Sequence, residues 1–213
     1  MNDMNRMAGR MVSVLLAAVL TLNSGCASEM GKGAPGKAAT LTQSYVWYDG
    51  DQQRTVWLNP QVVAEFNPDS KSESPVRSAY PSATPVQTKQ AQGAVRLWKF
   101  DTPAAGVIGS LKIAQPQGRY SAVFQDGPVS GSGMRALPGN IIVYLDPQWD
   151  AAKVGDWLAA HKLEVVQKLE IGPNIYVIRT GPGMEALDTA NALYRSGEVK
   201  AAFPDWWQEV TAR

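Results

Sequence analysis

The most constraining feature of this sequence is the order of strand-like and helix-like patterns across residues 140–206. Four short segments have the alternating or β-branched apolar composition of strands, and these are residues 140–145, 165–171, 175–180 and 199–203. Two segments repeat apolar residues at the helical period instead, and these are residues 150–161 and 184–195. The order strand, helix, strand, strand, helix, strand is that of a ferredoxin-like βαββαβ module. We therefore predict an α+β fold in which both helices cover one face of a four-stranded antiparallel sheet.

Local signals mark the ends of both expected helices. Asp150 lies where an N-cap residue belongs, and Val154, Trp157 and Leu158 follow on one helical face. Gly197 comes just past the second helix, where glycine can adopt the positive φ that closes many helices. The other face of the expected sheet is then either open or covered by another part of the chain.

Three stretches of the module carry a resemblance to a known family. Residues 142–147 read I-V-Y-L-D-P, residues 190–193 read A-N-A-L, and residues 199–206 read V-K-A-A-F-P-D-W. In this order and spacing they resemble the propeptides of subtilisin-like serine proteases. The lead-in at residues 123–139 and the aromatic hairpin at residues 45–50 are similar to such proteins as well. The resemblance implies a stand-alone form, made separately from a secreted protease as its external folding chaperone or inhibitor.

The resemblance also implies how such a module would act. It would dock the open sheet face on the protease and insert the tail, residues 207–213, into the active-site cleft by strand addition. The residues expected to bind the protease are Trp206, Trp207, Val210, Thr211, Ala212 and Arg213. Arg213 would fill the primary specificity pocket and Val210 the pocket three residues upstream. The alternative is a frayed terminus, and for the two tryptophans it is anchoring of the tail onto the domain.

The sequence lacks the residues for catalysis or metal binding. A Ser-His-Asp protease needs a histidine that serves a nucleophile, but the single histidine, His161, falls at a helix end and no serine elbow occurs. We expect His161 to lie over apolar neighbours. One histidine and one cysteine are too few for an ordinary zinc site. We predict a protein that is not an enzyme and has no cofactor.

The N-terminal residues are typical of an exported lipoprotein. Residues 1–25 have Arg6 and Arg10 before an apolar run at residues 11–22, shorter than the roughly 20 residues of a membrane span. The Ser-Gly-Cys sequence that ends at Cys26 resembles a bacterial lipobox, although Asn23 departs from it. We expect a lipidated Cys26, a tether over residues 26–43, and an outer-membrane location facing the periplasm. The alternative is plain secretion with a free thiol, and an intramolecular disulfide is excluded because Cys26 is the only cysteine.

Residues 44–139 read as a separate β-rich lobe. We expect a hairpin with strands at residues 45–48 and 55–58, turning at Asp49 and Gly50, and a third strand at residues 61–66. Residues 67–93 are rich in Ser, Pro, Gln and Lys, which predicts a flexible excursion. Three further strands are expected at residues 94–100, 107–113 and 119–124, before a Gly/Ser turn region at residues 126–133.

Charge and aromatic content limit the partners. The 20 Lys and Arg nearly balance the 19 Asp and Glu and form no basic stripe, so nucleic acid is an unfavourable partner. A membrane would be reached only through the lipid. The 7 tryptophans are mostly expected to pack in the core. They leave open a second function, the binding of a glycan or another envelope ligand through the aromatic β-region, and a third, a scaffold without a protease partner.

Overall fold

The structure, a computed structural model, describes residues 40–66, 73–87, 95–130 and 133–209. The expected signal peptide, Cys26, most of the tether and residues 210–213 lie outside these residues. The described chain is α+β with antiparallel sheets, as predicted. Residues 40 and 41 already belong to the folded part, because Thr40 bridges Val129 and Leu41 is buried. These two residues of the expected tether, 26–43, therefore pack on the folded part.

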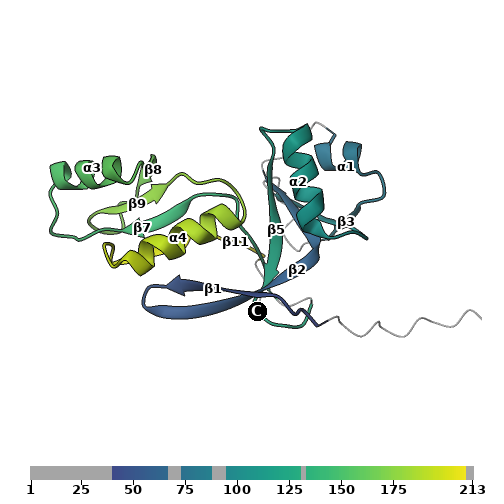
Figure 1. Ribbon diagram of the computed structural model, residues 1–213, viewed down its shortest axis with the longest axis horizontal. Coiled ribbons are helices and arrows are strands. Elements are labelled where there is room, and N and C mark those ends of the chain that lie inside the picture. The colour runs from purple at the N-terminus through teal and green to yellow at the C-terminus, as the bar shows by residue number, and fades with distance from the viewer. Residues whose placement is uncertain (1–39, 67–72, 88–94, 131–132, 210–213) are drawn as a thin grey trace, which may run out of the picture. The chain divides into compact units, whose positions relative to one another are not determined.

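The larger sheet has seven strands within the described residues (Figure 1). They are β1 (Ser44–Asp49), β2 (Gln52–Phe66), β3 (Thr84–Val86), β4 (Val95–Lys99), β5 (Arg119–Gln125), β6 (Met134–Ala136) and β11 (Trp207–Gln208). Their order is β11-β6-β5-β2-β4-β3, with β1 paired to β2. Strand β2 is the centre of this sheet, since its first half pairs with β1 and its second half pairs with β4 and β5.

The hairpin of β1 and β2 forms as predicted, but the third strand does not exist as a separate element. Asp49 pairs with Gln52 across a turn in which Gly50 has a φ of 63°. Beyond the hairpin, β2 continues without a break to Phe66 and is irregular between Asn59 and Val63. A bulge of this kind bends a strand without ending it, which explains why the sequence suggested two strands.

Two helices pack on the larger sheet where the sequence predicted other structure (Figure 1). They are α1 (Pro75–Ala79) and α2 (Ala104–Ala114). Residues 107–113 were expected as a strand, but Ala104, Val107 and Leu111 face the core together at helical spacing. The prediction of a strand is therefore wrong, because burial of this face outweighed the β-propensity of Val and Ile.

Part of the expected flexible excursion is ordered. Helix α1 and strand β3 lie inside residues 67–93, and Val76 and Ala83 join the core of α2 and the sheet. The buried Ser74 caps α1 and donates a 2.6 Å hydrogen bond to Glu65, which also accepts one from Trp98 at 2.9 Å. For residues 73–87 the prediction of flexibility is wrong, because a few well-placed contacts compensate for a polar composition.

The smaller sheet has the element order predicted for residues 140–206. Its strands are β7 (Ile141–Tyr144), β8 (Val165–Lys168), β9 (Ile175–Ile178) and β10 (Ala201–Pro204), and its helices are α3 (Ala151–Ala160) and α4 (Met184–Ser196). The strand order is β10-β7-β9-β8, and all pairs are antiparallel. Both predicted end signals are confirmed, because the Asp150 carboxylate accepts from the Lys153 amide at 2.8 Å and Gly197 is left-handed.

One hydrophobic core joins the two sheets. Val154 of α3 and Leu187 of α4 pack with Ile141 and Val143 of β7, and Trp47 and Phe124 of the larger sheet belong to the same cluster. The hairpin of β1 and β2 lies along α4 (Figure 1). The larger sheet therefore combines strands of residues 44–139 with β11, and it shares a core with the smaller sheet.

Candidate functional site

The face of the smaller sheet opposite its helices is apolar and half-exposed. Register places Ile142 beside Val177 on one side and Phe203 on the other, so these three side chains share a face. Tyr144 shares it too, with its ring centroid 5.7 Å from that of Phe203. These four side chains are half-buried, and we call them the open face.

The opposite face of the same strands is filled by the helices. Ile141, Val143 and Ile178 are fully buried, and they pack against Val154 of α3 and Leu187 of α4. Side chains alternate between faces along a strand, so burial of one set leaves the next set on the open face. The smaller sheet therefore has one face sealed by its helices and one face with half-exposed apolar side chains.

A pocket of about 780 Å³ lies at one edge of the open face. It combines aromatic walls with charged side chains from the hairpin, from the residue after β5, from β6 and from the segment after β10. Its lining residues are Trp47, Asp49, Gln53, Arg54, Thr55, Trp57, Asp126, Arg135, Ile142, Phe203, Pro204, Asp205, Trp206 and Gln208. Because Ile142 and Phe203 belong to both, the pocket is continuous with the open face.

Charges inside this pocket are paired except for one carboxylate. Arg54 lies 3.6 Å from Asp49, and Arg135 forms a close ion pair with Asp126. Asp205 has no ion pair or side-chain hydrogen bond with any part of the chain that the structure describes. Burial raises the pKa of Asp205, as expected for a carboxylate that loses water and gains no partner.

The two tryptophans expected to bind a protease are engaged within the chain. The Trp206 ring lies 5.7 Å from the rings of both Trp47 and Phe124. Trp207 pairs with Ala136, so the start of the tail is strand β11 at the edge of the larger sheet. The sequence weighed anchoring of the tail against partner contact, and the structure places both residues in anchoring contacts. Val210, Thr211, Ala212 and Arg213 lie outside the described residues.

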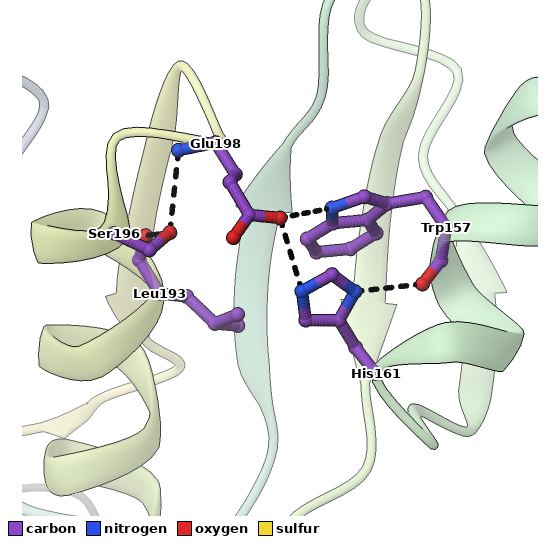
Figure 2. Close-up of polar contacts among 5 residues, drawn as sticks. All are labelled: Trp157, His161, Leu193, Ser196 and Glu198. Atoms are coloured by element: carbon purple, nitrogen blue, oxygen red, sulfur yellow. Dashed lines mark hydrogen bonds and ion pairs between the residues drawn. The ribbon is translucent and has the colours of Figure 1, made fainter.

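His161 ends α3 and holds it to the segment before β10. Its ring lies 4.2 Å from the Trp157 ring, its Nδ1 lies 2.8 Å from the Trp157 carbonyl oxygen, and its Nε2 lies 3.0 Å from Glu198 Oε2 (Figure 2). The Trp157 indole donates to the same Glu198 oxygen at 2.9 Å. The predicted helix-end position over an apolar neighbour is confirmed, while the partner Glu198 could not be read from the sequence.

Among the five residues drawn in Figure 2, no hydroxyl contacts the His161 ring as a nucleophile would. Ser196, two residues before Glu198, donates to the Leu193 carbonyl and accepts from the Glu198 amide instead of contacting the imidazole (Figure 2). Both ring nitrogens of His161 already face acceptors, and in the imidazolium form both donate. The arrangement suits a structural clasp between α3 and β10.

No three His, Cys, Asp or Glu side chains in residues 40–66, 73–87, 95–130 and 133–209 group closely enough to hold a metal ion. No helix in these ranges is long and apolar enough to cross a membrane.

The pocket is the part of the site that sequence reasoning missed. Its walls come from positions as far apart as Trp47 and Gln208, and only the tertiary fold brings them together. In the sequence, Asp205 is only one residue of the motif at residues 199–206 that resembles the propeptides, and no separate role is predicted for it. Comparisons with family models, with curated proteins and with solved structures find no match to this chain.

Proposed function

We propose that this chain is a non-catalytic partner of a subtilisin-like serine protease, acting as its external folding chaperone, its inhibitor or both. The observation that carries the proposal is the open face, four half-buried apolar side chains on a sheet whose other face is sealed by α3 and α4. Apolar patches of this kind mark surfaces for protein partners.

The topology of the smaller sheet supports the same proposal. Counted within residues 140–206, β7, β8, β9 and β10 are the first to fourth strands, so the observed order β10-β7-β9-β8 reads 4-1-3-2. This is the order expected for the ferredoxin-like module that the propeptide resemblance implies. With both helices on one side, the module presents its sheet to the protease and keeps its own core closed.

The tail would extend the contact from a fixed starting point. Trp206 packs against the core and β11 is paired to β6, with the Glu209 amide donating to the Met134 carbonyl at 2.9 Å. We therefore assign Trp206 and Trp207 to anchoring, and residues 210–213 to the protease cleft. A short extended segment there would bind by strand addition, with backbone hydrogen bonds giving affinity and alternate side chains filling pockets.

One surface would then serve both chaperoning and inhibition. A ligand that binds only the folded protease stabilises it by mass action, and the same ligand blocks substrate if its tail occupies the cleft. We further propose that the protein works in the cell envelope, exported and anchored through lipid on Cys26. Replacement of Cys26 by serine should release the protein from the membrane fraction. If its distribution between fractions were unchanged, the proposal of a lipid anchor on Cys26 would be wrong.

The proposal is tested by pairing the full chain with each secreted subtilisin-like protease of its source organism. We expect co-expression to raise the yield of one active protease, and the purified chain to inhibit that protease in a saturable manner. If no such protease is folded or inhibited, the proposal is wrong.

Removal of residues 210–213 separates the tail from the sheet face. This deletion leaves β11 and its pairing with β6 intact, so the fold should be unchanged. We expect inhibition to weaken at least tenfold, about 1.4 kcal/mol of binding, while the gain in folding yield persists. Unchanged inhibition by the shortened chain would exclude the tail from the cleft.

A further inference from the structure

The pocket beside the open face has a chemistry that the docking of an apolar sheet does not use. We propose that this pocket binds an alkylammonium group, and that a lysine side chain of the protein docked on the open face supplies it. The choice of a lysine as the source depends on the proposed function. The choice of an organic cation depends on the pocket alone.

The charge balance of the pocket favours a cation. Its walls hold three carboxylates, Asp49, Asp126 and Asp205, against two guanidinium groups, Arg54 and Arg135. Each guanidinium is paired with one of the first two carboxylates. The third carboxylate, Asp205, is left without a partner among the described residues. An ion pair with a ligand ammonium would supply the opposite charge that a half-buried carboxylate lacks.

Aromatic walls favour an organic cation over a bare metal ion. Trp57 and Phe203 are half-buried and line the pocket together with the Asp205 carboxylate. Aromatic faces attract ammonium groups and also pack against the methylene groups that carry them. The pocket already contains one such contact, because the Arg135 guanidinium carbon lies 5.8 Å from the centre of the Trp47 ring.

A strand edge adds acceptors for the ammonium protons. Between Gln52 and Val56, β2 pairs with β1 on one side, and its pairing with β5 begins only at Trp57. Gln53, Arg54 and Thr55 of this stretch line the pocket. An ammonium group has three donors, and backbone carbonyls at an unpaired strand edge can accept those that the carboxylate does not.

The position of the pocket points to a protein as the source of the cation. Ile142 and Phe203 form part of the open face and part of the pocket wall. A partner lying on the open face would therefore bring its own side chains to the pocket entrance. A lysine has an apolar stem for the aromatic walls and a charged end for Asp205. Such a buried, partly desolvated contact is where binding energy concentrates in interfaces.

The pocket's ligand class is tested first on the full chain without any protease. The probe is n-butylammonium, with n-butanol as its neutral counterpart, titrated while tryptophan fluorescence and NMR shifts are recorded. We expect saturable binding of n-butylammonium in the millimolar range and at least fivefold weaker binding of n-butanol. The Asp205→Asn variant should lose at least fivefold in affinity for the cation, and Asp156→Asn, an exposed acid on α3, should lose none.

The outcomes of this test are distinct. Equal affinity for both probes, or an unchanged affinity in Asp205→Asn, would overturn the assignment of a cation site. In the wild type, affinity for n-butylammonium should also fall on acidification as Asp205 takes up a proton, which checks the same contact without a substitution.

The source of the cation is tested by two further ligands and by the protease. Nα-acetyl-lysine methylamide carries the ammonium of a protein side chain, and glucosamine carries that of an envelope amino sugar. Tighter binding of the lysine derivative, with weaker protease inhibition by Asp205→Asn, supports a lysine of the partner. At least tenfold tighter binding of glucosamine than of the lysine derivative would overturn the assignment of a lysine side chain and indicate a glycan ligand instead. Because the n-butylammonium titration needs no partner, its result stands even if no protease is inhibited.

Discussion

Ser74 offers a strong test of the order found where composition predicted flexibility. It is buried, and its hydroxyl makes three contacts at the start of α1. Its oxygen accepts from the amides of Val76 and Arg77 at 3.2 and 3.3 Å. It also donates to the buried Glu65 carboxylate at 2.6 Å. The Ser74→Ala variant removes all three contacts, and the smaller side chain introduces no steric clash.

The expected loss follows from these contacts. Removing a serine N-cap costs about 1 kcal/mol. Removing a hydrogen bond to a charged group costs about 1.5–3 kcal/mol, and the Glu65 carboxylate keeps only its bond from Trp98 among the contacts that the structure shows. Because the contributions overlap, we expect Ser74→Ala to lower the free energy of unfolding by about 2–4 kcal/mol.

Equilibrium unfolding in urea measures this loss as a shift in midpoint at constant slope. The matched control is Ser78→Ala, the same substitution at an exposed position of α1. The control should change stability by no more than about 0.5 kcal/mol. If Ser74→Ala and Ser78→Ala were equally stable, α1 would not be held by Ser74 and Glu65, and our account of this segment would be wrong.

Two further predictions concern the hairpin and the pH dependence. Tyr48 stacks on Tyr194 with ring centroids 4.1 Å apart, so a double-mutant cycle with alanine should give a coupling energy of about 0.5–1.5 kcal/mol. A coupling energy near zero would contradict a stabilising contact between the hairpin and α4. Burial raises the pKa of Asp205, so its contribution to stability is present below its unfolded pKa and lost as pH rises through its folded pKa. The stability of Asp205→Asn relative to the wild type, measured by thermal unfolding, should therefore rise from acid to neutral pH. The amide of Gln148 lowers the pKa of Asp146. The contribution of Asp146 to stability is therefore present above its unfolded pKa and lost as pH falls through its folded pKa. The Asp146→Asn variant should therefore be the less stable one at neutral pH and converge with the wild type in acid, and a shift in the same direction for both variants would contradict the account.

Regular periodicity made the smaller sheet predictable from the sequence. Each of its strands and helices lies within two or three residues of its predicted bounds, because apolar residues recur at the period of the element that buries them. Asp150 and Gly197 mark helix ends by local backbone chemistry that tertiary packing does not alter. The fold class could be read from these segments alone.

The larger sheet was less predictable because its local signals compete with distant contacts. Val107 favours a strand by residue type, yet it faces the core from α2 together with Leu111. Ser74 lies in a polar segment, and its contact with Glu65, nine residues earlier, adds to the cap that orders the start of α1. Contacts of this kind depend on the finished fold and leave no periodic trace in the sequence.

The candidate site shows the same division. The open face follows from the alternation along β7, β9 and β10, but the sequence did not decide whether this face is open or covered by another part of the chain. The pocket depends on the approach of Trp57, Arg135 and Asp205 from three separate elements. Absence of catalysis and the identity of the partner stay predictions, since no residue contact decides them.

The most direct test of the central claim is the inhibition constant of open-face variants against the protease identified by co-expression. Tyr144→Asp and Val177→Asp each place a charge on the open face, and Ala152→Asp places the same charge at an exposed position of α3. Circular dichroism and urea unfolding would select the variants that keep the fold. We expect at least tenfold weaker inhibition by each folded open-face variant and no change for Ala152→Asp. If charges on the open face left the inhibition constant unchanged, the sheet would not be the surface that meets the protease, and the proposed function would be contradicted.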